Sequence, residues 1–94
     1  MNKVHIIGIG GIAMSAIAQF FLKKGYQVTG SDLEDNELIK QLQQQGAQIN
    51  IGHRVNNISP DVTKVIYSDA IPSDNIELLQ AQECDIKTLG RSEA

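Results

Sequence analysis

Three glycines near the start of the chain have the spacing of a phosphate-binding turn. Gly8, Gly10 and Gly11 follow a short apolar, β-branched stretch, and Ala13 completes the pattern Gly-x-Gly-x-x-Ala, a variant of the dinucleotide-binding fingerprint. Gly8 permits a tight turn, Gly10 lets an anion approach the backbone, and Ala13 lets the next helix lie close to the sheet. Amides at the helix start would then face the anion, with the Ser15 hydroxyl as a further donor. A strand–helix turn that binds nothing has the same pattern.

Other polar residues follow later apolar stretches. Asp32 has the place of the acidic residue that binds a ribose hydroxyl in NAD sites, although it could equally cap its own loop. Arg91 could pair with a phosphate or be solvated. His53 could be a surface loop histidine, and Ser68 could donate to a ligand or to its own loop.

The sequence lacks the motifs that are typical of metal sites and of ATP sites. The chain has two histidines and one cysteine, Cys84, without the spaced partners of a metal site. It has no G-x-x-x-x-G-K-[ST] loop, so we expect neither a metal nor an ATP site of that kind. A single cysteine also excludes an internal disulfide.

The elements that must position these residues alternate between strand and helix. We predict strands over 3–8, 26–32, 47–52, 64–68 and 85–89, and helices over 11–24, 35–46 and 74–83. This alternation predicts an α/β, Rossmann-like open parallel sheet of about five strands, ordered 3-2-1-4-5, with helices on both faces. Ligands of such sheets bind beyond the carboxyl ends of the strands, near the switch between the first and fourth strands.

The first helix has apolar columns and one polar column. The relevant columns are Ile12, Ala16, Phe20 and Ser15, Gln19, Lys23. We expect the polar column to be the only solvated stripe and the rest of the helix to be covered. Asp74 and Glu77 have the spacing of a capping box, which predicts the start of the last helix.

Composition excludes several classes of partner. The 94 residues are 41% hydrophobic and 4% aromatic, with net charge −3 and no basic stripe, so we expect no nucleic-acid binding. Residues 6–22 could be the apolar core of a secretory signal or a membrane span. Clustered glycines weaken a helix and divide this run into two elements, so we expect no membrane segment.

Segments along the whole chain resemble the UDP-N-acetylmuramate:L-alanine ligases of the Mur ligase family. They are "HIIGIGGIAMSAIA" (5–18), "VTGSD" (28–32), "GH" (52–53), "YSDAIPSDNIELLQA" (67–81) and "GRSEA" (90–94). The family usually has glycine where Ala13 stands, and Ser-Ser where Ser68 and Asp69 stand.

The resemblance implies a function for the chain. Residues 1–94 would be a single N-terminal domain that binds the UDP part of UDP-N-acetylmuramate, in a cytoplasmic ligase of peptidoglycan biosynthesis. The central ATPase domain, which binds ATP and Mg²⁺, and the C-terminal domain would be absent, so the chain alone would be inactive. Its partners would be UDP-N-acetylmuramate and the remaining ligase domains.

The resemblance also implies roles for individual residues. Those facing the diphosphate would be Gly8, Gly10, Gly11, Ile12, Ala13, Met14 and Ser15. Ser31 and Asp32 would lie near the ribose or uracil. The rest of the pocket would be lined by His53, Ser68, Ala70 and Ile71.

Two other functions remain open from the residues. An NAD-binding domain of an oxidoreductase would use the same glycines and Asp32. A regulatory module could sense a nucleotide or mediate assembly. The glycine pattern does not separate these possibilities, and the segment "AIPSDN" (70–75) favours the ligase through the resemblance alone.

Overall fold

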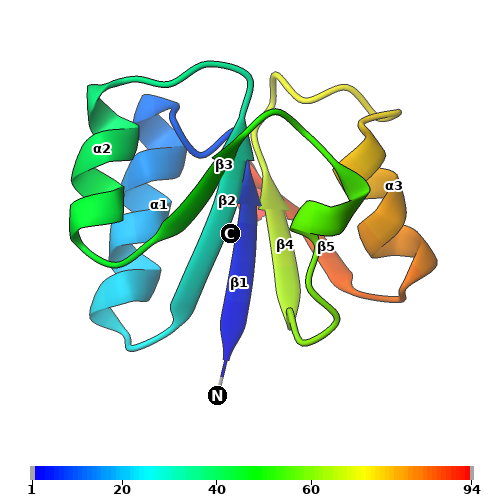
Figure 1. Cartoon of the computed structure of the whole chain (residues 1–94). Coiled ribbons are helices and arrows are strands. Elements are labelled where there is room, and N and C mark those ends of the chain that lie inside the picture. The colour runs from blue at the N-terminus through cyan, green and yellow to red at the C-terminus, as the bar shows by residue number, and fades with distance from the viewer. Residues whose placement is uncertain (1, 94) are drawn as a thin grey trace.

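The chain folds into one five-stranded parallel sheet with helices on both faces (Figure 1). The computed structural model describes residues 2–93; Met1 and Ala94, the ends of the expected domain, lie outside them. The strands are β1 Lys3–Ile7, β2 Gln27–Asp32, β3 Gln48–Ile51, β4 Lys64–Tyr67 and β5 Lys87–Gly90. The helices are α1 Ile12–Lys23, α2 Glu37–Gln44 and α3 Ile76–Glu83, with short 3₁₀ turns η1 Val55–Asn57 and η2 Arg91–Glu93. The order β3-β2-β1-β4-β5 confirms the predicted topology.

Alternation along the central strand β1 divides the core into two layers. Val4 and Ile6 pack on one face of the sheet with α1 and α2, and Ile7 packs on the other face with α3. Figure 1 shows this division, with α1 and α2 to one side of the strands and α3 to the other. His5 is also fully buried and contacts Glu77 of α3. The sheet therefore carries a polar contact inside its second layer.

The expected burial of α1 is wrong in both of the columns named above. Ile12 and Phe20 are 84% and 54% exposed, whereas Ser15 is buried. The helix instead packs through Met14, Ala18 and Phe21, because one sheet face covers only one side of a helix. Ser15 can be buried because its hydroxyl donates to the Ile12 carbonyl at 2.9 Å.

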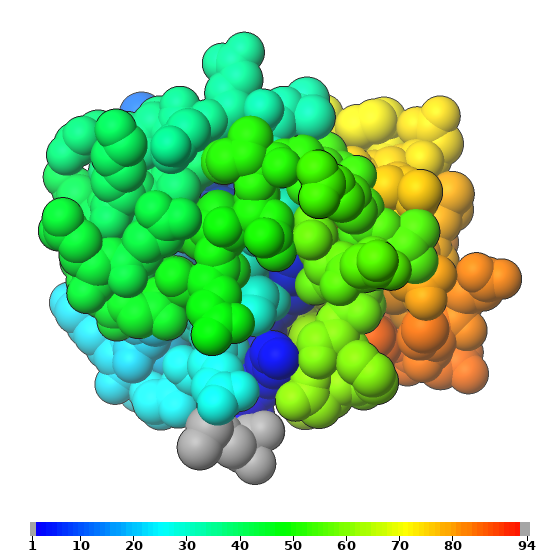
Figure 2. Space-filling view, viewed as in Figure 1, coloured from blue at the N-terminus to red at the C-terminus, as the bar shows by residue number. Residues whose placement is uncertain are grey.

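The chain between α2 and β4 closes the α3 side of the molecule. Figure 2 shows this green segment lying across the front of the sheet, so that only part of β1 is visible. Within it, η1 contacts α3. Within residues 2–93, no helix combines the length and apolar character needed to cross a bilayer.

Candidate functional site

The turn after β1 lies at the carboxyl edge of the sheet and is fastened to β2. Gly8 has φ +84°, which favours glycine, and an added Cβ there would lie 3.0 Å from the Ser68 Cβ. The amides of Gly8 and Ile9 donate to the Ser31 carbonyl at 2.8 and 3.1 Å. The amide of Gly11 donates to the Gly8 carbonyl at 3.2 Å. These amides are therefore occupied within the protein.

Gly10 makes room for the loop after β2. Its amide donates to Asp32 Oδ2 at 2.8 Å, and its carbonyl accepts from Asn36 Nδ2 at 3.0 Å. A Cβ on Gly10 would lie 2.9 Å from Asp32 Oδ2 and 3.0 Å from Ile39 Cδ1. The missing side chain, expected to let an anion approach the backbone, instead accommodates this loop in the structure. Asp32 also accepts from the Leu33 amide at 2.8 Å, so its carboxylate caps its own loop.

The first turn of α1 offers free backbone donors at this edge. Gly11 is the N-cap and offers no side-chain acceptor, and the first turn has no acidic residue. By helix geometry the amides of Ile12, Ala13 and Met14 have no intrahelical acceptor, whereas the Ser15 amide donates to the Gly11 carbonyl at 2.8 Å. These three amides and the helix dipole give α1 the character of an anion-binding terminus.

Three side chains of this region have roles other than those expected. Ala13 is exposed and does not bring α1 close to the sheet; Met14 and Ala18 pack there instead. The Ser15 hydroxyl is buried and bonded to the helix backbone, so it does not face the edge. Ser31 is fully buried, which excludes direct contact between its hydroxyl and a ligand in this conformation.

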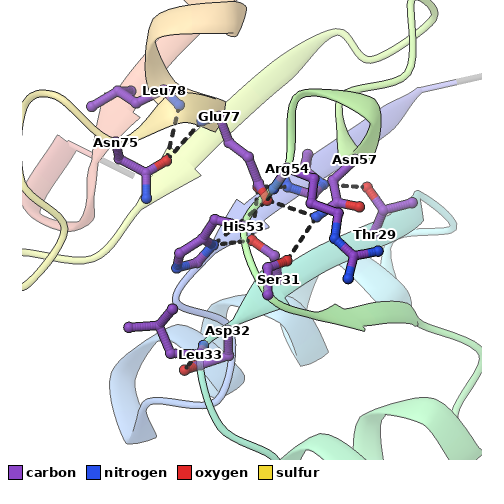
Figure 3. Close-up of polar contacts among 12 residues, drawn as sticks. Thr29, Ser31, Asp32, Leu33, His53, Arg54, Asn57, Asn75, Glu77 and Leu78 are labelled. Carbon is purple, nitrogen blue, oxygen red and sulfur yellow. Dashed lines mark hydrogen bonds and ion pairs between the residues drawn. The ribbon is translucent and has the colours of Figure 1, made fainter.

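A buried carboxylate that the sequence analysis missed lies behind the edge (Figure 3). The capping-box assignment is wrong: Asn75 caps α3, its Oδ1 accepting from the amides of Glu77 and Leu78 at 2.9 and 3.2 Å. The Glu77 side chain is fully buried. Its Oε1 accepts from His5 Nε2 and from the Ser31 hydroxyl, each at 2.7 Å.

The second oxygen of this carboxylate binds the segment after β3. Glu77 Oε2 accepts from the Arg54 amide at 2.9 Å and from Asn57 Nδ2 at 2.7 Å. Burial raises the pKa of Glu77, but hydrogen bonds from His5, Asn57 and Ser31 together outweigh burial and lower the pKa to about 2. The carboxylate is therefore ionised at neutral pH.

His53 connects this network to the edge of the sheet. Its Nδ1 lies 2.8 Å from Ser31 Oγ and 3.5 Å from Glu77 Oε2. Its side chain is 11% exposed, and no bond to Nε2 is found among residues 2–93. His53 therefore has one ring nitrogen held by the protein and one available to a ligand.

The loop after β4 is held by its own polar groups. Ser68 Oγ accepts from the Ala70 amide at 3.1 Å, and the Ser68 carbonyl accepts from the Ile71 amide at 3.0 Å. Arg91 Nη2 lies 2.7 Å from Asp69 Oδ2, so in this structure the guanidinium is paired with an exposed carboxylate. Ala70 is exposed and Ile71 half-buried beside Gly8.

Two open hollows compete as binding sites. One of about 410 Å³ lies beside the start of α1 and is lined by Gly10, Gly11, Asp32, Leu33, Glu34, Asp35 and Asn36. A slightly larger one, about 440 Å³, lies at the opposite edge near Lys3, Tyr26 and Gln48. We assign the site to the first hollow, because parallel sheets bind ligands at their carboxyl edge and because this hollow adjoins Gly11, directly before the free amides of α1. The described residues contain no cluster of three potential metal ligands.

Known proteins share both the sequence and the fold of the chain. Residues 3–94 match the family model described as "Mur ligase family, catalytic domain". The UDP-N-acetylmuramate–L-alanine ligase of Clostridium novyi is 53% identical over 92 residues, which are 98% of this chain and 20% of that protein.

Two solved structures of ligases are similar to this chain in fold. The UDP-N-acetylmuramate-alanine ligase of Thermotoga maritima superposes with a TM-score of 0.92 at 34% identity, over 98% of this chain and 21% of that one. A murein peptide ligase of Psychrobacter arcticus superposes with a TM-score of 0.86 at 25% identity, over 94% and 18%. The chain thus spans about a fifth of the length of the relatives it matches. With its sheet order, its glycine turn and a family match over nearly all its residues, the chain belongs to the Mur ligase family.

Proposed function

We propose that this chain is the domain that binds the UDP part of UDP-N-acetylmuramate in an L-alanine ligase of peptidoglycan biosynthesis. The names of its relatives support the reaction. The observation that carries the binding role is the uncapped first turn of α1, at the carboxyl edge of the sheet. A diphosphate supplies the negative charge that such a terminus favours.

The remaining groups of the ligand are assigned by position. We assign the diphosphate to the amides of Ile12, Ala13 and Met14 and the ribose or uracil to the hollow beside Asp32. His53 Nε2, Ala70 and Ile71 line the rest of the pocket in this proposal. Ser31 contributes indirectly, since its hydroxyl is used inside the protein.

The chemical step belongs to residues outside this chain. In the proposed ligase, ATP and Mg²⁺ are bound elsewhere, because the sequence has no P-loop. ATP would phosphorylate the muramoyl carboxylate, and the alanine amine would then attack the acyl phosphate. The domain would hold the nucleotide while the other domains perform this chemistry in the cytoplasm, and by itself it would be inactive.

Calorimetric titration of the chain tests the ligand class. We expect heat from UDP-N-acetylmuramate and none from NAD. Heat from NAD alone would support the oxidoreductase alternative, which the relatives do not favour. The absence of binding heat with either compound would favour a regulatory module and refute the proposal.

A proline substitution tests the role of the α1 amides. Ile12→Pro removes one free amide and keeps the helix, because proline is well accepted at a first helical position. The preceding Gly11 has φ −70° and ψ 154°, the extended conformation that a residue before proline requires. Loss of one charge-assisted hydrogen bond should weaken UDP-N-acetylmuramate binding about 10-fold or more.

Ile12→Ala is the matched control, since it removes the same exposed side chain and keeps the amide. We expect its affinity to stay within about threefold of the wild type, because the 84%-exposed side chain buries little area. Equal affinities for the two variants would remove the α1 terminus from the site.

A further inference from the structure

The Glu77 carboxylate has no capacity left for a ligand. It comes from α3 and accepts four hydrogen bonds, from His5 of β1, Ser31 of β2, and the Arg54 amide and Asn57 after β3. A carboxylate has about four lone-pair sites, so all are occupied. Figure 3 shows Ser31, Arg54 and Asn57 converging on Glu77 from different elements. Glu77 can therefore affect a ligand at the carboxyl edge of the sheet only through the residues that donate hydrogen bonds to it.

The network determines which atoms carry protons. An ionised carboxylate only accepts, so the Ser31 hydroxyl must donate its proton to Glu77. Ser31 Oγ is then an acceptor toward His53 Nδ1, which must carry a proton. Neutral His53 is left with an unprotonated Nε2, which is a hydrogen-bond acceptor.

The same reasoning gives His5 the opposite tautomer. In a neutral His5, Nε2 donates to Glu77, so Nδ1, which lies 2.7 Å from Thr29 Oγ1, accepts from that hydroxyl. The two histidines of the chain are thus held in opposite tautomers by one carboxylate.

We propose that Glu77 is a positioning residue of the nucleotide site: through Ser31 it places the proton on His53 Nδ1 and leaves Nε2 as an acceptor for a donor group of the ligand. Such donors are a ribose hydroxyl or the N3–H of a uracil ring. The outer side of the His53 ring points away from Ser31 and Glu77 in Figure 3. The inference rests on the proposed function only in assigning His53 to the ligand.

A Glu77→Gln substitution should reverse which atoms donate and which accept along the chain from residue 77 through Ser31 to His53. The side-chain NH₂ of the glutamine cannot face the Arg54 backbone amide or Asn57 Nδ2, because both of these groups are donors. Asn57 Nδ2 also donates to the Gly52 carbonyl at 3.0 Å, which fixes its orientation. The amide group must therefore face His5 and Ser31 and donate to them. Ser31 then donates to His53 Nδ1, so that the proton of His53 moves to Nε2.

The direct test is the tautomeric state of both histidines without any ligand. Long-range ¹H–¹⁵N correlation spectra at about pH 8, above the usual titration range of histidine, distinguish protonated from unprotonated ring nitrogens. In the wild type we expect Nδ1–H for His53 and Nε2–H for His5; in Glu77→Gln we expect the two assignments to exchange. A His53→Gln variant identifies the signals. Nε2–H for His53 in the wild type would overturn the proposal, whether or not Glu77→Gln folds.

Binding is the second test. UDP-N-acetylmuramate affinity should fall about 10-fold in Glu77→Gln, because Nε2 changes from acceptor to donor and faces a donor of the ligand. Glu83→Gln is the matched control, an exposed glutamate in the last turn of the same helix, and should bind like the wild type. Backbone spectra confirm that each variant is folded.

The two proposals fail in different ways. A wild type that does not bind UDP-N-acetylmuramate refutes the proposed function, while the tautomers still test the proton order. A wild type that binds, together with a folded Glu77→Gln that has exchanged tautomers and equal affinity, overturns the positioning role.

Discussion

Glu77 should make the stability of the fold depend on acid in a predictable range. Its pKa is about 2 in the folded chain, against an ordinary value of 4.5. The unfolded chain therefore binds a proton at higher pH than the folded chain does. The stabilising contribution of Glu77 is complete above about pH 4.5 and is lost as the pH falls through about 2.

The size of this contribution follows from the pKa difference. A difference of about 2.5 units corresponds to about 3 kcal/mol at neutral pH. This value is an upper bound, because solvent near the partly exposed His53 screens the interaction. With these two pKa values, about 2 kcal/mol of the contribution is lost at pH 3.

Urea unfolding followed by circular dichroism measures the effect. At neutral pH, Glu77→Gln should unfold more easily than the wild type by up to about 3 kcal/mol, because the amide cannot accept four hydrogen bonds. At about pH 3 the difference should shrink by about 2 kcal/mol, because at this pH Glu77 is protonated in the unfolded chain, with a pKa of 4.5, but still mostly ionised in the folded chain, with a pKa of about 2.

Glu83→Gln serves as the control at both pH values. It removes a carboxylate from the exposed end of α3, and its stability should follow the wild type closely. A difference between the wild type and Glu77→Gln that is the same at both pH values would refute the assignment of an ionised, hydrogen-bonded carboxylate.

Two further pairs of substitutions test the packing. Phe21→Ala should cost about 3 kcal/mol, because Phe21 is 8% exposed, whereas Phe20→Ala should cost less than about 1 kcal/mol, because Phe20 is 54% exposed. Equal melting temperatures for the two variants would contradict the orientation of α1. Gly30→Ala should cost about 1–3 kcal/mol, since its Cβ would lie 2.5 Å from Ile9 Cδ1. Gly11→Ala, whose Cβ would meet nothing closer than 3.6 Å, should melt within a few degrees of the wild type; a larger loss for Gly11→Ala than for Gly30→Ala would contradict this packing.

The carboxyl edge could be predicted because its signals are local. An apolar stretch that ends at Gly8 marks strand β1, and the alternation of strands with helices along the chain predicts a parallel sheet. The carboxyl ends of parallel strands meet at one edge, so the glycine turn, Asp32, His53 and Ser68 were predicted to gather there. Sheet topology does not predict which side chains these residues contact.

The amino-acid sequence by itself determined the order of the elements, the position of the turn and the edge that carries the site, because periodicity and turn residues act over a few neighbours. Only the tertiary structure decided that Glu77 is buried and that it is connected to His53 through Ser31. Glu77 meets Ser31 and His5 across 46 and 72 positions of the chain. In the sequence, the spacing of Glu77 from Asp74 is that of a helix capping box, so it gives no sign that Glu77 is buried. A buried charge is stable only where enough donors converge on it, and that convergence exists only after the sheet and α3 have packed.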